Sequence, residues 1–193
     1  MSNTDALPTL SFENPQSWEA WLNEQHATSK GIWLKIAKKE TGIPSVSYAE
    51  ALDVALCYGW IDGQKAVFDD QFWLKKFTPR GTKSIWSKIK CDKAEALIDA
   101  GRMQPAGLRQ VELARADGRW AAAYESQRAI SIPDDFQREL DQHPQAQAFF
   151  RTLNSANRYA ILYRIQTAKK PETRAARIQK LIAMLARGEK FHP

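Results

Sequence analysis

The hydrophobic pattern of the chain changes its period once, close to residue 90, and this change limits the folds available to the chain. Upstream of that point, short runs alternate apolar and polar residues as strands do, and helical stretches lie between them. Downstream, the apolar residues recur at helical spacing almost to the end of the chain. The pattern predicts an α+β fold with a small N-terminal antiparallel or mixed sheet and its helices, followed by an all-helical C-terminal part.

Capping and turn residues place the elements of the N-terminal half. Asn14-Pro15 is typical of a helix start, and Ser47 with Glu50 forms a capping box. Gly59 can end the second helix in a left-handed conformation. The predicted elements are a helix over 15–26, a strand within 30–39, a helix from residue 48 to Gly59, and a hairpin of residues 60–67 and 71–78.

Prolines and glycines divide the C-terminal half into helices, with predicted starts near Asp92, Pro105, Pro133, Pro144, Ser155 and Pro171. The segment 126–135 is the best candidate for a linker. We therefore expect two domains, an α+β domain over 1–125 that holds the candidate site and a helical module over 126–193 that packs on the first.

Composition favours a cytoplasmic protein. The N-terminal residues lack the basic and apolar regions of a secretory signal, and no apolar run approaches the ~20 residues that a membrane span needs. Cys57 and Cys91 do not suggest a disulfide framework. Cys57 lies on an apolar helix face and is expected to be a buried thiol rather than a nucleophile.

The net charge of +6 is concentrated in a few segments. Residues 75–93 hold seven Lys or Arg and one acidic residue, with Trp86 among them. A basic segment with an interleaved aromatic residue is one way to bind nucleic acid, so a nucleic-acid-binding protein is an alternative function. The other interpretation of this segment is a solvated basic face.

A candidate ligand site combines the run WIDGQ with the loop PRGTKSIW. Alternation along a strand puts Trp60, Asp62 and Gln64 on one face, with Ile61 facing the core. If the loop folds over this face, Arg80 could hold a phosphate or carboxylate through its planar guanidinium group. The predicted ligand-binding residues are Trp60, Asp62, Gln64, Arg80, Lys83 and Trp86. A structural interpretation is open as well, in which Asp62 pairs with Arg80 and the two tryptophans lie in the core.

No motif indicates catalysis, a metal or a cofactor. His26, His143 and His192 lie far apart, and the spacings of zinc sites, nucleophile elbows, P-loops and dinucleotide folds are missing from the sequence. We therefore assign no catalytic residue, no metal ligand and no cofactor. An enzyme that uses Asp62 as a general acid or base is a further alternative, and it would need this carboxylate in a concave pocket with a shifted pKa.

Several blocks together resemble the YdeI/OmpD-associated proteins, also called bacteriocin-protection proteins. These blocks are HATSKGIWLKIAKK, SYAEALDVALCYGWIDGQ, FTPRGTKSIWSKI, GRMQPAG and the run from LNSANRYAILYRIQ to LIAMLARGE. The likeness covers roughly residues 26–190, although the family pattern has a basic residue and Asn where this chain has Gly81 and Lys90. It implies a helical C-terminal module and a bacterial protein linked to tolerance of antimicrobial peptides, with no established enzymatic activity.

The sequence therefore predicts a non-enzymatic binding or stress-tolerance protein of this family. Its expected partner is an anionic small molecule or a protein, and nucleic acid is a weaker possibility. The acidic first third of the chain and the missing nucleic-acid-binding motifs argue against the latter.

Overall fold

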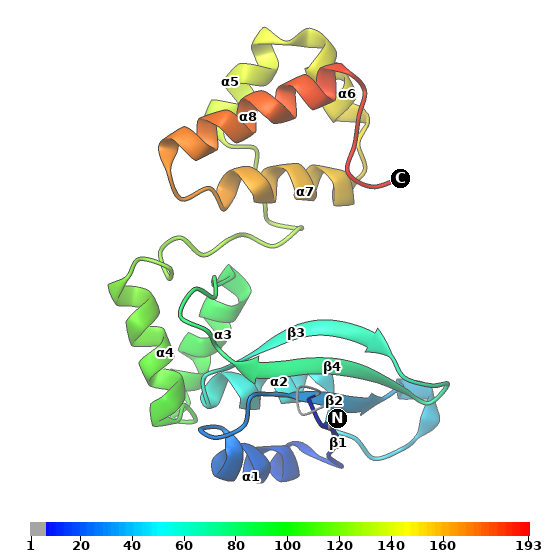
Figure 1. Ribbon diagram of the computed structural model, residues 1–193, viewed down its shortest axis with the longest axis vertical. Coiled ribbons are helices and arrows are strands. Elements are labelled where there is room, and N and C mark those ends of the chain that lie inside the picture. Colours follow the sequence, from blue (N-terminus) through cyan, green and yellow to red (C-terminus); the bar gives the residue numbers. More distant parts are fainter. Residues whose placement is uncertain (1–6) are drawn as a thin grey trace, which may run out of the picture. The chain divides into compact units, whose positions relative to one another are not determined.

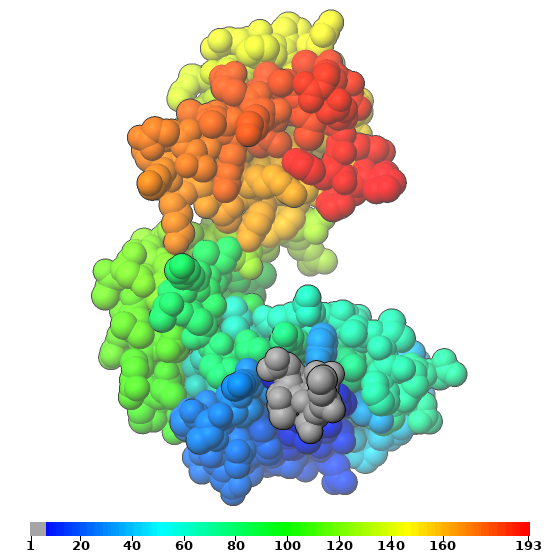
Figure 2. Space-filling view, in the orientation of Figure 1, coloured from blue at the N-terminus to red at the C-terminus, as the bar shows by residue number. Residues whose placement is uncertain are grey.

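The computed structural model describes residues 7–193, which divide into two compact units. The first unit comprises the described residues up to Ile85 together with Lys90–Ala121. The second unit comprises Trp86–Ile89 and Ala122–Pro193. Figure 1 labels the helices and strands of both units, and Figure 2 shows their atoms in the same colours. The packing of the C-terminal helices on the sheet stays a prediction.

The first unit is built on a four-stranded mixed sheet, which confirms the predicted α+β class. Its strands are β1 (Thr9–Ser11), β2 (Ile32–Ala37), β3 (Trp60–Val67) and β4 (Phe72–Pro79), in the spatial order β1-β2-β4-β3. β3 and β4 form the predicted antiparallel hairpin, and β2 runs antiparallel to β4. β1 pairs with β2 in parallel, and this short strand was not predicted from the sequence.

The helices α1 (Pro15–Gln25) and α2 (Tyr48–Cys57) begin at the predicted caps. The side chain of Asn14 accepts a hydrogen bond from the N–H of Ser17 (2.9 Å). At the start of α2, the predicted capping box is present in both directions, between Ser47 and Glu50. Gly59 follows α2 with a φ of 72°, as the left-handed stop requires.

Both helices pack on the sheet face that carries Ile32, Leu34 and Ile36, which are buried as the alternation predicted. The indole of Trp18 in α1 lies 5.8 Å from the ring of Phe77 and donates to the main-chain oxygen of Ala51 in α2 (3.1 Å). Aromatic rings therefore fill the space between the sheet and the two helices.

The described residues of the first unit also include α4 (Pro105–Ala116), a 3₁₀ turn at Lys39–Thr41 and most of α3 (Lys88–Asp99), whose first two residues belong to the second unit. α3 begins at Lys88, so the predicted start near Asp92 is wrong by one turn. The start of α4 lies directly against the end of α2, and glycines permit this approach. A Cβ on Gly107 would collide with the main-chain oxygen of Cys57, and one on Gly59 would lie 2.8 Å from the oxygen of Ala106.

The second unit contains four helices among its described residues, α5 (Asp134–Gln142), α6 (Pro144–Thr152), α7 (Ser155–Gln166) and α8 (Pro171–Ala186). Their apolar faces form one core that includes Phe136, Phe150 and Ile165. The cap of α7 is Asn154, whose side chain accepts from the N–H of Asn157, whereas the sequence predicted Ser155. Within the described part of the chain, no helix combines the length and the apolar character that crossing a membrane requires.

Candidate functional site

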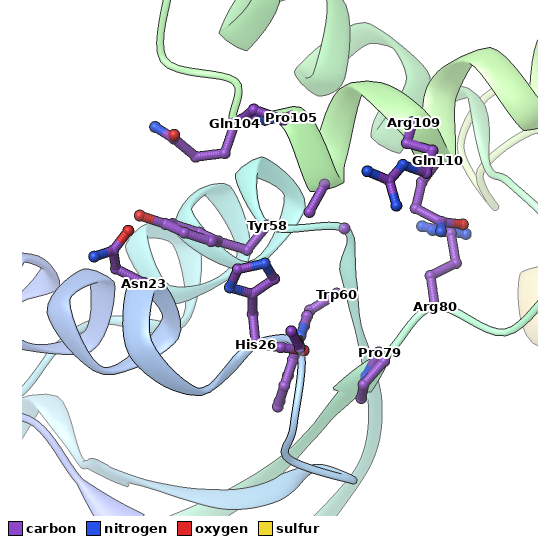
Figure 3. Close-up of a pocket in the computed structure, with 13 residues that line it drawn as sticks. Asn23, His26, Tyr58, Trp60, Pro79, Arg80, Gln104, Pro105, Arg109 and Gln110 are labelled. Carbon is purple, nitrogen blue, oxygen red and sulfur yellow. Dashed lines mark hydrogen bonds between the residues drawn. The ribbon is translucent and has the colours of Figure 1, made fainter.

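A pocket of about 510 Å³ lies in the first unit, where the ends of α1 and α2 meet the start of α4. Figure 3 shows His26 and Tyr58 on one side of it, Arg80, Arg109 and Gln110 on the other, and Trp60 with Pro79 below. Of the six predicted ligand-binding residues, Trp60 and Arg80 line this pocket.

Arg80 is largely fixed in its position. Only 5% of its surface is exposed, its main-chain N–H donates to the oxygen of Gly59 (3.0 Å), and its Nη1 donates to the oxygen of Ile85 (3.2 Å). Arg109 lies in the second turn of α4 and is exposed, and its side chain forms no hydrogen bond or ion pair with another described residue. The two guanidinium groups give the pocket a positive wall, because no Asp or Glu is among the described residues that line it.

His26 adds a polar group to the opposite wall. Its Nδ1 lies 2.9 Å from the main-chain oxygen of Leu22, and because a carbonyl can only accept, Nδ1 carries the hydrogen. Nε2 is then available to a ligand. The His26 ring lies 5.3 Å from the ring of Tyr58, and the oxygen of His26 accepts from Nε1 of Trp60 (3.2 Å). Burial raises the pKa of Tyr58, so its hydroxyl stays protonated near neutral pH.

The indole of Trp60 is 1% exposed, so the prediction that it points away from the core, with Ile61 facing inward, is wrong. Its ring meets Trp18 and Trp21 edge-on at 6.3 Å and 5.8 Å. Trp60 thus belongs to the aromatic core, and only part of it reaches the pocket.

Asp62 lies on the same face of the sheet but binds three donors of the first unit. Its Oδ2 accepts from the hydroxyl of Tyr48 (2.9 Å) and lies 3.0 Å from Nζ of Lys75, and its Oδ1 lies 2.5 Å from Nζ of Lys90. The side chain of Asp62 is only 9% exposed. The structural interpretation predicted that Asp62 pairs with Arg80, and this pairing is wrong: the cations at its carboxylate are Lys75 of β4 and Lys90 of α3.

These contacts weaken the alternative of an enzyme that uses Asp62. Burial raises the pKa of its carboxyl group, but the hydrogen bonds and charges of Lys90 and Lys75, with the hydroxyl of Tyr48, outweigh burial and hold the pKa below its usual range. A carboxylate that stays ionised and accepts from three partners is a poor proton carrier near neutral pH. Asp62 is also not among the residues that line the pocket.

The other predicted residues lie apart from the pocket lining. A register shift between Asp62 and Lys65 breaks the alternation of β3, so Gln64 does not continue the face of Asp62 and is exposed. Lys83 is also exposed. Trp86 belongs to the second unit, where it is buried and its main-chain oxygen accepts from the N–H of Tyr124 (3.1 Å).

Few cations of the basic segment 75–93 are accessible to the phosphates of a nucleic acid. Lys75 and Lys90 pair with Asp62, Lys93 pairs with Asp53 (2.6 Å), and Arg80 is buried. This use of the positive charge within the first unit weakens the nucleic-acid alternative, because backbone phosphates require accessible cations.

Sequence reasoning missed the part of the pocket that α1 and α4 supply, of which His26 and Arg109 carry the chemistry. A usable signal was present for Arg109, since it lies one turn after the predicted helix start at Pro105. No such signal exists for His26, because it is brought to the pocket only by the packing of α1 against α2.

Within the described residues, no group of three or more His, Cys, Asp or Glu is placed to hold a metal ion. The Cys57 thiol is buried as the sequence predicted, and burial raises its pKa to about 11. It is therefore protonated and inert near neutral pH.

Two family models match different parts of the chain. The model described as "Domain of unknown function (DUF8412)" matches residues 10–110, more than half of the chain. The model described as "Bacteriocin-protection, YdeI or OmpD-Associated" matches residues 129–188, so the resemblance is confirmed there but not over the whole range of 26–190. No curated protein and no solved structure matches the chain. The chain thus belongs to the DUF8412 family of unknown function, and it carries a YdeI/OmpD-associated domain in its helical C-terminal part.

Proposed function

We propose that the protein is a non-enzymatic binding protein whose pocket in the first unit takes a small molecule with a carboxylate or phosphate group. One observation carries this proposal: two guanidinium groups, Arg80 and Arg109, line a pocket in which none of the described lining residues is acidic. An anion placed there lies beside two positive charges, and the exposed guanidinium group of Arg109 can donate planar N–H groups to it.

The start of α4 adds to the attraction for an anion. Gln104, Pro105 and Ala106 line the pocket, and the first N–H groups of a helix lack acceptors within the helix. The side chain of Gln104 does not cap these groups and instead donates to the main-chain oxygen of Arg102 (3.3 Å). The positive end of the helix dipole therefore acts in the same direction as the guanidinium groups.

The lining residues support binding more than catalysis. Uncharged polar groups come from Asn23, Tyr58, Gln104 and Gln110, which can hydrogen-bond a ligand and distinguish one anion from another. Neither a carboxylate nor a thiol is found among the described lining residues. The two groups that invited a catalytic interpretation, Asp62 and Cys57, are respectively ion-paired and buried.

Titration calorimetry at low ionic strength tests the proposal, with inorganic phosphate, succinate and benzoate as probes. We expect at least one probe to bind, and Arg109→Gln to weaken it by roughly 5–15-fold, because a hydrogen bond to a charged group contributes about 1–1.5 kcal/mol. The matched control is Arg102→Gln, which removes an exposed charge close in sequence that does not line the pocket. Equal losses in the two variants, or no binding of any probe, would show that the pocket is not an anion site.

The same proposal includes a cellular role for the protein, tolerance of bacteriocins. The description of the model that matches residues 129–188 names bacteriocin protection. If ligand binding in the first unit serves that role, a strain that carries Arg109→Gln should be more sensitive to bacteriocin than the wild-type strain. Survival equal to that of the wild type would show that ligand binding in the pocket does not contribute to bacteriocin tolerance.

A further inference from the structure

A groove of about 870 Å³ lies in the second unit, between α7 and α8 and beside the segment that follows α8. Figure 1 shows the two helices joined by a short turn, and Figure 2 shows the atoms of α8 and the C-terminal residues (orange to red) on one face of the second unit. The C-terminal segment is held by Asn157, which is 1% exposed. Its Oδ1 accepts from the N–H groups of Phe191 (3.0 Å) and His192 (2.9 Å).

The groove is strongly basic. Four cationic side chains line it, whereas Glu189 is the one acidic residue in its described lining, which gives a net charge of +3. That carboxylate is already bound by Arg187, whose Nε and Nη2 donate to its two oxygens at 2.8 Å and 2.9 Å. The charges of Arg164, Arg177 and Lys180 are therefore left to attract a negative partner.

Main-chain carbonyls hold two of these cations in place without neutralising them. Nη1 of Arg164 donates to the oxygen of Ala160 (2.7 Å), and Nη1 of Arg177 donates to the oxygen of Arg164 (2.6 Å). Each guanidinium group keeps further N–H groups for a ligand. Lys180 is exposed, and its side chain forms no hydrogen bond or ion pair with another described residue. A partly fixed array of cations loses less freedom on binding than three mobile side chains would.

The groove also has an apolar part, formed by Ala183 and Met184 of α8 with Tyr163 of α7, while Leu181, which also lines it, belongs to the core and is 5% exposed. Methionine adapts its shape to the side chain that it meets, and it recurs in grooves that bind peptide helices. Cations beside aliphatic and thioether groups complement a segment that carries carboxylates beside apolar side chains.

A nucleic acid fits this surface less well than a peptide does. The aromatic rings in the described lining of the groove are those of Tyr163 and Phe191. The guanidinium carbon of Arg164 already lies 3.8 Å from the centroid of Phe191, and the ring of Tyr163 packs against Tyr124 and Tyr159 at 5.0 Å and 5.7 Å, so both rings already have partners with which a base would have to compete. The aliphatic part of the groove would remain unused by phosphates and ribose, whereas a leucine or isoleucine side chain would be buried there.

We propose that the groove between α7 and α8 binds an acidic peptide segment of a protein partner, with its carboxylates on Arg164, Arg177 and Lys180 and its apolar side chains against Ala183 and Met184. This site is separate from the pocket of the first unit, and its occupant is a macromolecule rather than a small anion. Either site can therefore fail without affecting the other.

Fluorescence anisotropy with the full chain tests this inference. The probe is a short fluorescein-labelled peptide of Glu and Leu residues, with the glutamates and leucines on adjacent faces of a helix. We expect saturable binding that weakens with salt, a roughly 5–10-fold loss of affinity in Lys180→Glu, and a comparable loss in Ala183→Trp, which obstructs the groove without changing its charge. The control Lys169→Glu makes the same charge change in the second unit at an exposed residue outside the groove lining, and it should bind like the wild type.

Further probes separate the proposed occupant from other anions. Replacing the leucines of the peptide by Ser should weaken binding as strongly as replacing its glutamates by Lys, because both parts of the groove contribute. If Lys169→Glu weakened binding as much as Lys180→Glu, or if the Ser-containing peptide or a single-stranded oligonucleotide bound as tightly as the probe, the inference would be overturned. Circular dichroism of each variant confirms that the helices are intact.

Discussion

Replacing Asp62 by Asn should destabilise the first unit by about 2–4 kcal/mol. The substitution keeps the shape of the side chain but removes the negative charge that lies 3.0 Å from Nζ of Lys75 and 2.5 Å from Nζ of Lys90. The side chains of these lysines are only 14% and 17% exposed. Two ammonium groups would then share a largely buried site without a counter-charge.

The magnitude follows from opposing contributions. One ion pair at ~4 Å is worth about 4 kcal/mol at an effective dielectric constant of ~20, and the variant loses two pairs. Part of this is offset because Asp62 no longer has to be stripped of water, and because the tips of Lys75 and Lys90 retain some exposure. A net loss of about 2–4 kcal/mol corresponds to a fall in Tm of roughly 6–15 °C for a unit of this size.

The effect should depend on pH in a defined direction. The pKa of Asp62 is lowered in the folded protein, so its stabilising contribution is fully present above the ordinary pKa and disappears as the pH falls through the lowered value. The difference in free energy of unfolding between wild type and Asp62→Asn is therefore constant near neutrality and shrinks only below about pH 4.

Urea unfolding followed by tryptophan fluorescence measures this difference, because six of the seven tryptophans belong to the first unit. The control is Asp53→Asn, which breaks the more exposed pair with Lys93 (side chains 29% and 35% exposed) and should lose less than about 1 kcal/mol. If Asp62→Asn and Asp53→Asn agreed within about 0.5 kcal/mol at pH 7, the central role given to the Asp62 cluster would be refuted.

Three further changes test other parts of the fold. Gly107→Ala should cost roughly 3 kcal/mol, because its Cβ meets main-chain oxygens of α2, whereas Gly63→Ala, with its nearest neighbour atom at 3.6 Å, should change the urea midpoint little. Arg174→Met removes two hydrogen bonds (2.6 Å and 2.9 Å) to the carboxylate of Asp135 in α5, so it should destabilise the second unit by about 1–2 kcal/mol. Thermal unfolding followed by far-UV circular dichroism measures this loss, and the control Arg187→Met, at an exposed ion pair, should have little effect. The thiol of Cys57, with its pKa raised to about 11, should react with a disulfide reagent at pH 8 only as fast as the first unit opens, and prompt reaction in the native protein would contradict its burial.

The parts of the fold that could be predicted are those whose cause is local in sequence. The capping box of Ser47 and Glu50 joins residues three apart, and the burial of alternate residues in β2 follows from strand geometry. β1 was missed because three residues are too few to show a period, and only its pairing with β2 defines it. α3 begins a turn early because the N–H of Lys88 donates to the oxygen of Tyr124 (2.9 Å), a partner that the local sequence does not reveal.

Two of the six predicted site residues, Trp60 and Arg80, line the pocket, and the orientation of β3 was not predictable from the sequence. Alternation shows that Trp60 and Asp62 share one face of β3, but it does not show which face is buried. Because Ile61 is apolar, its face was predicted to be the buried one, whereas the buried face is that of Trp60. The shift in register after Asp62 takes Gln64 off the sheet face that carries Asp62. The neighbouring Gly63 is the one local sign of such a bulge, because glycine inside a strand often marks one. The cations for Asp62 come from β4 and α3, so only the tertiary fold could identify them.

The contact of α2 with α4 has a consequence for how this pocket can change over evolution. Gly59 and Gly107 bring two main chains together, so the frame of the pocket does not depend on which side chains line it. Side chains such as Asn23, Gln104 and Arg109 could then be exchanged while the frame stays in place. Proteins that share the two glycines could thus accept different ligands in the same cavity, whereas a protein with a larger residue at position 107 would have to rebuild the cavity itself.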